Sequence, residues 1–276
     1  ADGRVSLTLS AKDRNVLRRL AGEVAELAAR RVEKEKRDLW LRHNALEATR
    51  PVIFCDPENG WNEIFPPEAL ACEGKLARML EFRLRKEVFW GEEMCDDRVI
   101  LPTFDMPHVY TTTGWGLLGE RIGGAHGGAY TWEPPIRSRS DLARLHFPEI
   151  EIDEAATQRL LDFTHDLFDG LLNVRLRTSW WWTLGMTWTL ANLRGLSQLM
   201  IDMIDEPDLV HDLMAILRDG TLAVLDSLER RGLLSANTGG EYVGSGGFGW
   251  TYELPQLDAN DKVRTCDMWG FAESQE

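Results

Sequence analysis

Acidic and histidine side chains follow several predicted strands, and these are the residues best placed to do chemistry. Asp105 comes directly after an apolar run at 99–104, and His108 follows three residues later. Glu241 follows two glycines at the end of another predicted strand, and Asp267 lies in the last predicted strand. In a pocket, such groups act as general acids or bases, and a carboxylate can also bind a metal ion. We therefore predict four catalytic residues: Asp105, His108, Glu241 and Asp267.

The same residue types also serve structure, and the sequence leaves this alternative open. Asp105 could cap a helix or brace a loop, because aspartate commonly accepts backbone hydrogen bonds there. Asp56 and Asn59 occupy a turn after the first predicted strand, where both residue types are common for local reasons. We expect Asp56 and Asn59 to contact substrate, with turn formation as the alternative.

Three consecutive tryptophans, Trp180, Trp181 and Trp182, precede a glycine-led turn into a predicted helix. Rings that point to both sides of a strand pack under helices on one face and line the interior of an α/β fold on the other. We expect these rings, together with Trp269, to form an apolar wall of the substrate pocket. A hydrophobic core without a ligand is the alternative, because tryptophan is costly to expose.

Predicted strands alternate with predicted helices along the chain, which is typical of an α/β protein with a parallel sheet. In parallel barrels the reacting groups gather at the carboxyl ends of the strands. A long loop at 110–135, rich in glycine, threonine and tryptophan, is expected to contain a hairpin. The predicted helices span 10–48, 66–88, 140–143, 153–169, 187–204 and 207–231, and the predicted strands span 51–55, 99–104, 171–179, 235–242 and 263–269.

This order of elements predicts a TIM-like (β/α)8 barrel with an N-terminal helical extension. Residues 1–49 form the extension, and residues 50–276 form the front portion of the barrel. Only five or six strands are predicted, and the chain stops directly after one of them. The barrel is therefore expected to be incomplete at the C-terminus of this chain.

Composition restricts the function classes. The formal net charge of -14 argues against a nucleic-acid-binding protein, which needs a basic face. No apolar run reaches the length of a membrane span. The four cysteines form no C-x-x-C pair, so they predict neither a disulfide framework nor a zinc motif within the chain. These observations favour a cytoplasmic enzyme, and they assign no metal ligand among the 276 residues.

Four segments occur in a characteristic order: Arg50-Pro51-Val52, the run from Val99 to Asp105, the run from Leu184 to Ala191, and the stretch from Gly195 to Leu213 with Asp-Glu-Pro at 205–207. Together they resemble the uroporphyrinogen decarboxylase superfamily, which also contains corrinoid-dependent methyltransferases. The resemblance covers roughly residues 48–270. It implies that Asp105 corresponds to the aspartate that faces the pyrrole nitrogens in the decarboxylases.

One departure from that family pattern limits which substrates are expected. The decarboxylases carry an arginine-rich motif just after the first strand, where it binds the carboxylates of the porphyrinogen. This chain has Cys55-Asp-Pro-Glu-Asn-Gly60 at that place. Two acidic side chains would repel a substrate with many carboxylates. Uroporphyrinogen is therefore not the expected substrate.

The resemblance favours the methyltransferase branch, in which a methyl group moves between a small organic substrate and a corrinoid (cobalamin). Members of that branch use zinc held by histidine and thiolate ligands, which here would lie beyond residue 276. Two alternatives stay open: a cofactor-free decarboxylase of a small carboxylic acid, or a non-catalytic barrel subunit that binds a corrinoid protein. The expected partners are a small methyl donor or acceptor, a corrinoid protein and a second copy of the chain, but neither nucleic acid nor a membrane.

Overall fold

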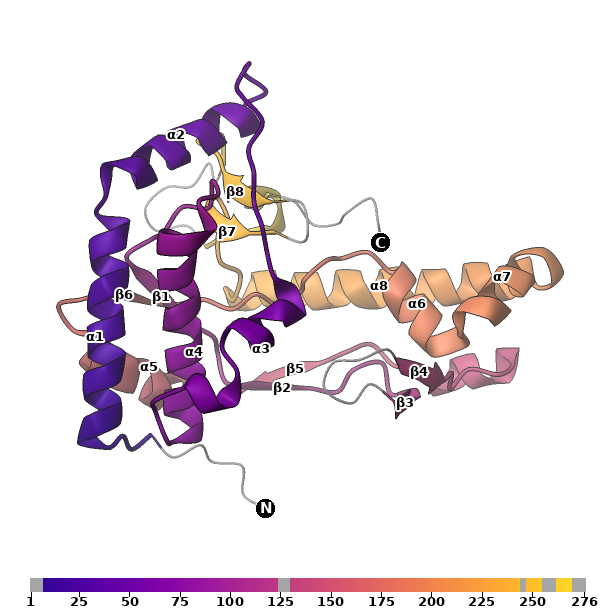
Figure 1. The fold of residues 1–276 in the computed structure, drawn as a ribbon. Helices are drawn as coiled ribbons and strands as arrows, with labels where there is room; N and C mark the ends of the chain where they lie inside the picture. Colours follow the sequence, from indigo (N-terminus) through magenta and orange to yellow (C-terminus); the bar gives the residue numbers. More distant parts are fainter. Residues whose placement is uncertain (1–6, 124–129, 244–246, 255–261, 270–276) are drawn as a thin grey trace.

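The computed structural model describes residues 7–123, 130–243, 247–254 and 262–269. It is a mixed helix and strand structure in which four small two-stranded sheets lie among longer helices (Figure 1). Within these residues the strands form no closed barrel, although one pair is parallel as an α/β fold requires. None of the described helices has the length and apolar character needed to cross a bilayer.

The N-terminal region forms two helices rather than one continuous helix. Helix α1 spans Ala11–Ala28 and α2 spans Arg31–Asn44, with a break at 29–30. The side chain of Ser10 accepts a hydrogen bond from the backbone N–H of Asp13, and this N-cap agrees with the predicted helix start at residue 10. The apolar residues of α1 recur every three or four positions and pack into the core, so the helix is held by one buried face.

Helix α4 (Lys75–Phe89) packs along α1, and the two lie side by side in Figure 1. It continues into one π-helical turn, Trp90–Met94, and ends at Cys95, whose φ is 50°. The predicted start of this helix at residue 66 is wrong. Pro66 precedes only a short 3-10 turn, Pro67–Ala69, and the α-helix begins after Gly74.

The parallel sheet consists of β1 (Thr103–Met106) and β6 (Asn173–Leu176), joined in part by α5 (Glu154–Phe168). Phe104 and Val174 are register partners, and both point into the core that α1 and α4 cover. The N-terminal helices therefore share a hydrophobic core with the α/β part of the chain.

The remaining strands pair antiparallel in short ribbons. The expected hairpin within 110–135 is confirmed by one of these pairs, β3 with β4. A second pair, β2 with β5, forms the long arm that runs along the lower part of Figure 1. A third pair, β7 with β8, packs against α2. Their bounds are β2 Tyr110–Thr112, β5 Ile150–Ile152, β3 Glu120–Gly123, β4 Tyr130–Glu133, β7 Gly239–Tyr242 and β8 Phe248–Trp250.

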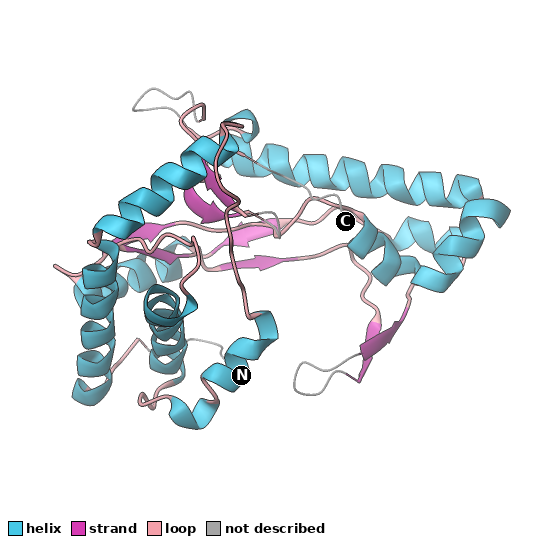
Figure 2. Ribbon diagram, turned by 45° about the horizontal axis from the view of Figure 1, so that its top comes forward, coloured by secondary structure: helices cyan, strands magenta, loops and turns pink. Residues whose placement is uncertain are grey.

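Three helices form a second core away from the parallel sheet, as both ribbon views show (Figures 1 and 2). Helix α8 begins at Pro207, where the missing N–H of proline removes no helical hydrogen bond. The predicted helix over 187–204 is divided at Gly195, whose φ of 85° does not fit a helix. The bounds are α6 Thr187–Arg194, α7 Leu196–Asp205 and α8 Pro207–Arg231.

Three predicted strands are corrected. Residues 51–55 are extended but do not join a sheet, because acidic side chains rather than a neighbouring strand accept from their backbone: Asp97 from Ile53 N and Asp96 from Cys55 N. The 263–269 segment contains a 3-10 turn, Thr265–Asp267, in place of a strand. The tryptophan run at 180–182 lies in a loop, so the expected strand ends earlier, at residue 176.

The shorter segments bear out one further prediction. The short helix expected at 140–143 appears as the 3-10 turn η5 (Arg139–Arg144), started by a capping box between Ser138 and Asp141. The other short elements connect longer ones: η1 is Glu58–Gly60, α3 is Trp61–Ile64 and η6 is Thr265–Asp267.

Replacing Leu80 by alanine tests the packing of α4 on α1. The Leu80 side chain is fully buried, so its loss leaves a cavity and lowers the free energy of unfolding by roughly 2–5 kcal/mol. The neighbouring Met79 is half exposed on the same helix. Met79→Ala is the matched control, and chemical denaturation should show at most a small change. Equal losses for the two variants would contradict this packing.

The cysteines should differ sharply in reactivity. Cys72 is buried against α1, and burial raises the pKa of its thiol to about 12. Cys55, Cys95 and Cys266 are exposed. At pH 8 a thiol reagent should modify three cysteines quickly, and Cys72 only after denaturation, because the thiolate is the reactive form. Rapid modification of all four in the folded protein, located by peptide mass mapping, would contradict the placement of Cys72.

Candidate functional site

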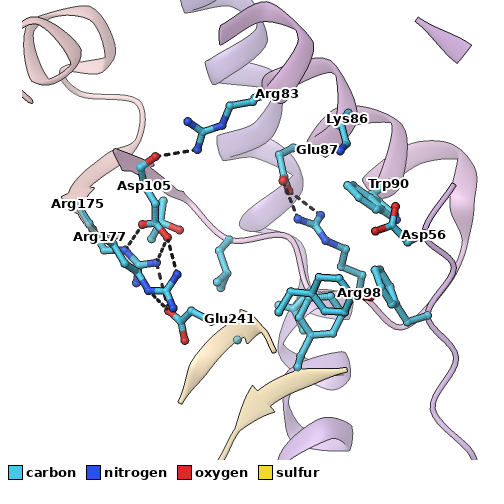
Figure 3. A pocket seen from close by; sticks show the side chains of 17 residues that line it. Asp56, Arg83, Lys86, Glu87, Trp90, Arg98, Asp105, Arg175, Arg177 and Glu241 are labelled. Atoms are coloured by element: carbon cyan, nitrogen blue, oxygen red, sulfur yellow. Dashed lines mark hydrogen bonds and ion pairs between the residues drawn. The ribbon is translucent and has the colours of Figure 1, made fainter. Parts of the chain in front are cut away.

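A pocket of about 350 Å³ lies where α4, the β1–β6 pair and the β7–β8 hairpin meet (Figure 3). The alternation of side chains along β1 explains its wall. Phe104 and Met106 are buried in the core, whereas Thr103 and Asp105 face the pocket. Helix α4 closes the opposite side. Five basic and four acidic side chains line the pocket, together with four aromatic rings.

Asp105 and Arg175 are brought together by the strand register. The two residues are direct partners in the parallel pair, so their side chains leave the sheet on the same face. Arg175 Nε lies 2.6 Å from Asp105 Oδ1, and Arg175 Nη2 lies 2.9 Å from Oδ2. Two such parallel hydrogen bonds fix both groups in position and are stronger than bonds between neutral groups.

A second carboxylate and a second guanidinium extend this pair into a network of four charges. Glu241 Oε1 lies 3.4 Å from Arg175 Nη2 and 3.6 Å from Arg177 Nε. Arg177 Nη1 lies 3.7 Å from Asp105 Oδ2. The Arg177 Nε atom is buried and makes no hydrogen bond within the described structure. The backbone N–H of Gly239 donates to Glu241 at 2.7 Å and holds the carboxylate in place. The four charges balance one another.

The Arg98 guanidinium is also neutralised. Its two Nη atoms each lie 2.6 Å from an oxygen of Glu87, and the guanidinium lies 4.1 Å from the centroid of the Trp90 ring. Asp56 accepts a hydrogen bond from Trp61 Nε1 at 3.0 Å, which positions its carboxylate at the other end of the pocket.

Arg83 and Lys86 differ from the other basic residues of the pocket. Arg83 donates to the backbone oxygen of Asp105 at 2.8 Å, and its guanidinium lies 4.2 Å from the Phe104 ring centroid. Lys86 Nζ lies 4.9 Å from the ring centroid of Trp61. Among the described residues, neither side chain has a carboxylate within 4.0 Å.

Burial lowers the pKa of both Arg83 and Lys86. Burial lowers the pKa of Arg83, and the nearby carboxylates oppose this effect only partly. Burial also lowers the pKa of the Lys86 ammonium, and the carboxylates of Asp56 and Glu87 oppose this effect in part. The positive charges of Arg98 and Arg83 add a smaller lowering. The charged forms of these two residues are therefore the ones that an anionic ligand would stabilise.

Three of the ten predicted site residues line the pocket: Asp56, Asp105 and Glu241. Asp267 lies elsewhere, paired with Arg264 at 2.9 Å, where it caps a 3-10 turn. Asn59 lies in η1, outside the pocket lining. The structure thus brings together Asp105 of β1, Glu241 of β7 and Asp56, and it leaves Asn59 and Asp267 apart from them.

His108 and the predicted tryptophans lie outside the pocket lining. His108 Nδ1 lies 2.8 Å from Thr178 Oγ1, and its ring stacks on Trp180 with centroids 5.5 Å apart. Trp182 is exposed, and its ring centroid lies 5.0 Å from that of the pocket residue Tyr242. The pocket lining includes none of His108, Trp180, Trp181, Trp182 and Trp269.

The basic residues of the pocket were not predicted from the sequence. Arg175 and Arg177 are separated by one residue in a predicted strand, a spacing that places both on one face. Arg83 and Lys86 are three residues apart on a predicted helix, which also places them on one face. These two spacings were the available signals.

The described residues contain no group of three or more histidine, cysteine, aspartate or glutamate side chains arranged to hold a metal ion. The zinc ligands implied by the family resemblance were expected beyond residue 276, so that prediction is not tested. The chemistry available in the pocket comes from carboxylates, guanidinium groups and one amine.

His108 should titrate below the usual histidine range. Burial lowers the pKa of His108 from 6.5, and nearby Glu154 opposes this effect only partly. The unfolded chain therefore binds the proton more readily, and stability contributed by neutral His108 is lost as the pH falls below about 6.5. An NMR titration should give a midpoint for His108 below 6.5. A midpoint at or above 6.5 would contradict the burial of this ring.

Comparison of the chain with protein-family models, with curated proteins and with solved structures finds no match. The family resemblance drawn from the four sequence segments therefore stays a prediction, and the function has to be argued from the pocket itself.

Proposed function

We propose that the pocket binds a small carboxylic acid and that the protein is an enzyme that decarboxylates it without a cofactor. The observation that carries the proposal is the pair of cations on α4. Arg83 and Lys86 line the pocket, and no carboxylate among the described residues pairs with them. Charges withdrawn from water are normally paired, because an unpaired one loses hydration without compensation.

The rest of the pocket supports an external anion as the missing partner. Asp105, Glu241 and Glu87 are each already within ion-pair distance of an arginine of the pocket. These three carboxylates are therefore poor candidates to neutralise the α4 cations. The fourth, Asp56, raises the pKa of Lys86 but lies beyond ion-pair distance of it in the described structure. A ligand carboxylate would supply charge-assisted hydrogen bonds, which contribute about 1.5–3 kcal/mol each.

The size and the aromatic part of the pocket fit a small acid. A volume of about 350 Å³ is near the lower end for ligand-binding cavities, about 300–1,000 Å³. Trp90, Phe54 and Tyr242 supply apolar surface beside the cations. A carboxylate that lies against apolar surface is poorly solvated, and this favours its conversion into neutral carbon dioxide.

Asp105 has a defined part in this proposal. Its carboxylate faces the pocket and is held by two hydrogen bonds from Arg175, so it cannot rotate away. A carboxylate has about four acceptor positions, and Arg175 occupies two of them, so Asp105 can still accept a hydrogen bond from a protonated intermediate. Asp105 would therefore stabilise the intermediate, while α4 holds the acid.

Corrinoid-linked methyl transfer is the second proposal. Four aromatic side chains line the pocket and would suit an apolar methyl donor: Phe54, Trp90, Tyr242 and Phe248. This proposal includes the finer fold expectation, in which the parallel β1–β6 pair belongs to a (β/α)8 barrel completed by chain beyond residue 276. Methylcobalamin should then change its absorption spectrum when the protein and a methyl acceptor are added. An unchanged spectrum across a panel of acceptors would count against it.

Replacing Arg83 by methionine tests the acid-binding site. The variant keeps most of the side-chain volume but removes the charge, so malonate should bind at least about tenfold more weakly by calorimetry. Arg19→Met is the matched control, because Arg19 lies exposed on α1 and pairs only with Glu23 in the described structure. Its malonate affinity should equal that of the unmodified protein.

Carbon dioxide release gives the reaction readout. A panel of small keto acids and dicarboxylic acids should include one that releases carbon dioxide with the unmodified protein, and the release should be lost in Asp105→Asn. Absence of both malonate binding and carbon dioxide release would reject the decarboxylase proposal.

A further inference from the structure

The Lys86 amine lies among three aromatic rings and has no ion-pair partner in the described structure. Its Nζ lies 4.9 Å from the ring centroid of Trp61, 5.4 Å from that of Trp90 and 5.8 Å from that of Phe82. Within the described residues it makes no hydrogen bond to a carboxylate and no ion pair. Its side chain nevertheless lines the pocket, so a ligand can reach the amine (Figure 3).

We propose that Lys86 forms a Schiff base with the ketone of a β-keto acid and that Arg83 holds a second carboxylate of the same substrate. This inference rests on the decarboxylase proposal, and it names the substrate class and the nucleophile. Arg83 and Lys86 stand at positions i and i+3 of α4, where Cβ atoms lie about 5–6 Å apart. A short keto diacid, with one carboxylate next to the ketone, spans such a separation.

The surroundings of Lys86 favour loss of its proton, which the reaction needs. An ammonium group has no free electron pair, so a nucleophilic lysine must react in its neutral form. Burial lowers the pKa of Lys86, Asp56 and Glu87 oppose this effect in part, and Arg98 and Arg83 act in the same direction as burial. Arg83 stays charged at neutral pH, because a guanidinium does not deprotonate in this range. One residue of the pair can therefore bind the anion while the other reacts.

The proposed reaction balances without any group that the pocket lacks. Lys86 Nζ attacks the ketone carbon, and the ketone oxygen leaves as water. The bond to the β-carboxylate then breaks, carbon dioxide departs, and its electron pair moves through the new C=C bond to the cationic nitrogen, giving a neutral enamine. A proton from water is added at carbon, and a second addition of water releases the keto product and the free amine.

The two substrate carboxylates would lie in different surroundings: the leaving one beside the tryptophan rings, and the retained one beside Arg83. The Trp61 and Trp90 rings near Nζ offer no hydrogen-bond donor beside the leaving carboxylate, since both indole N–H groups donate elsewhere, to Asp56 Oδ1 and to Cys55 O. The carboxylate that remains with the product is held by the Arg83 guanidinium. Asp105, whose backbone oxygen accepts from Arg83, lies on the same side as that guanidinium.

Reductive trapping tests the Schiff base directly. The full chain is incubated with oxaloacetate and cyanoborohydride, and peptide mass mapping locates the reduced adduct. We expect one adduct, on Lys86. It should be absent from Lys86→Arg, which keeps the charge but lacks a nucleophilic amine. It should remain in Lys75→Arg, because Lys75 is an exposed lysine at the start of the same helix. Acetoacetate, which lacks the second carboxylate, should be trapped at least about tenfold less efficiently.

Two controls keep the outcome decisive. Lys86→Met retains the aliphatic stem against the rings, and an unchanged melting curve shows that either variant is folded. If the protein binds malonate but oxaloacetate leaves no adduct on Lys86, this inference is wrong while the acid-binding proposal stands. Adducts spread equally over Lys75 and Lys86 would also overturn it. If the unmodified protein does not bind malonate, the decarboxylase proposal itself is rejected.

Discussion

The parallel register of β1 and β6 is the constraint on which the pocket depends. It places Asp105 directly beside Arg175, where the two side chains form a bidentate ion pair. A shift of one residue would turn Arg175 toward the core and leave Asp105 without its nearest cation. The register is fixed on the other face, because Phe104 and Val174 are both buried in the core beneath α1 and α4. Hydrophobic burial on one face of the sheet thus sets the electrostatics on the other.

The sequence predicted the features whose causes are local. The predicted helix starts near 10, 153 and 207 agree with the structure. Ser10 and Asp153 accept a hydrogen bond from the first turn, and Pro207 lacks an N–H that would go unpaired there. The strand expected over 263–269 was wrong, because Arg264 and Asp267 close a capping interaction that favours a turn. The Trp180 ring is held by Leu233 O and His108, both distant in sequence, so its position was not available from local pattern.

The same distinction between local and distant causes explains which site residues were found. Asp105 and Glu241 were predicted because an acid at a strand terminus is visible in the sequence, and both line the pocket. Arg83 and Lys86 lie on a helix with many other charged residues, so their spacing resembled an ordinary solvated face. Only the fold shows that this face covers a cavity. The cations that carry the proposed function therefore emerge from tertiary packing rather than from a motif.

A buried charged side chain whose hydrogen bonds are all satisfied within the chain has a structural role, whereas one without a partner can bind a ligand. The second core contains an example of the first kind. There Arg194 and Asp202 are both buried, and Arg194 Nη2 lies 3.1 Å from Asp202 Oδ1. Arg194 also donates to Ile136 O, and Gln198 donates to Asp202. Every charge of that pair has a partner inside the chain, so nothing remains for a ligand to satisfy. Arg83 and Lys86, in contrast, have no carboxylate partner among the described residues. The chain carries a net charge of -14, so its overall field does not attract anions. That field is screened beyond about 10 Å at 0.1 M salt, which leaves recognition of an acid to the short-range hydrogen bonds that these two basic side chains can offer.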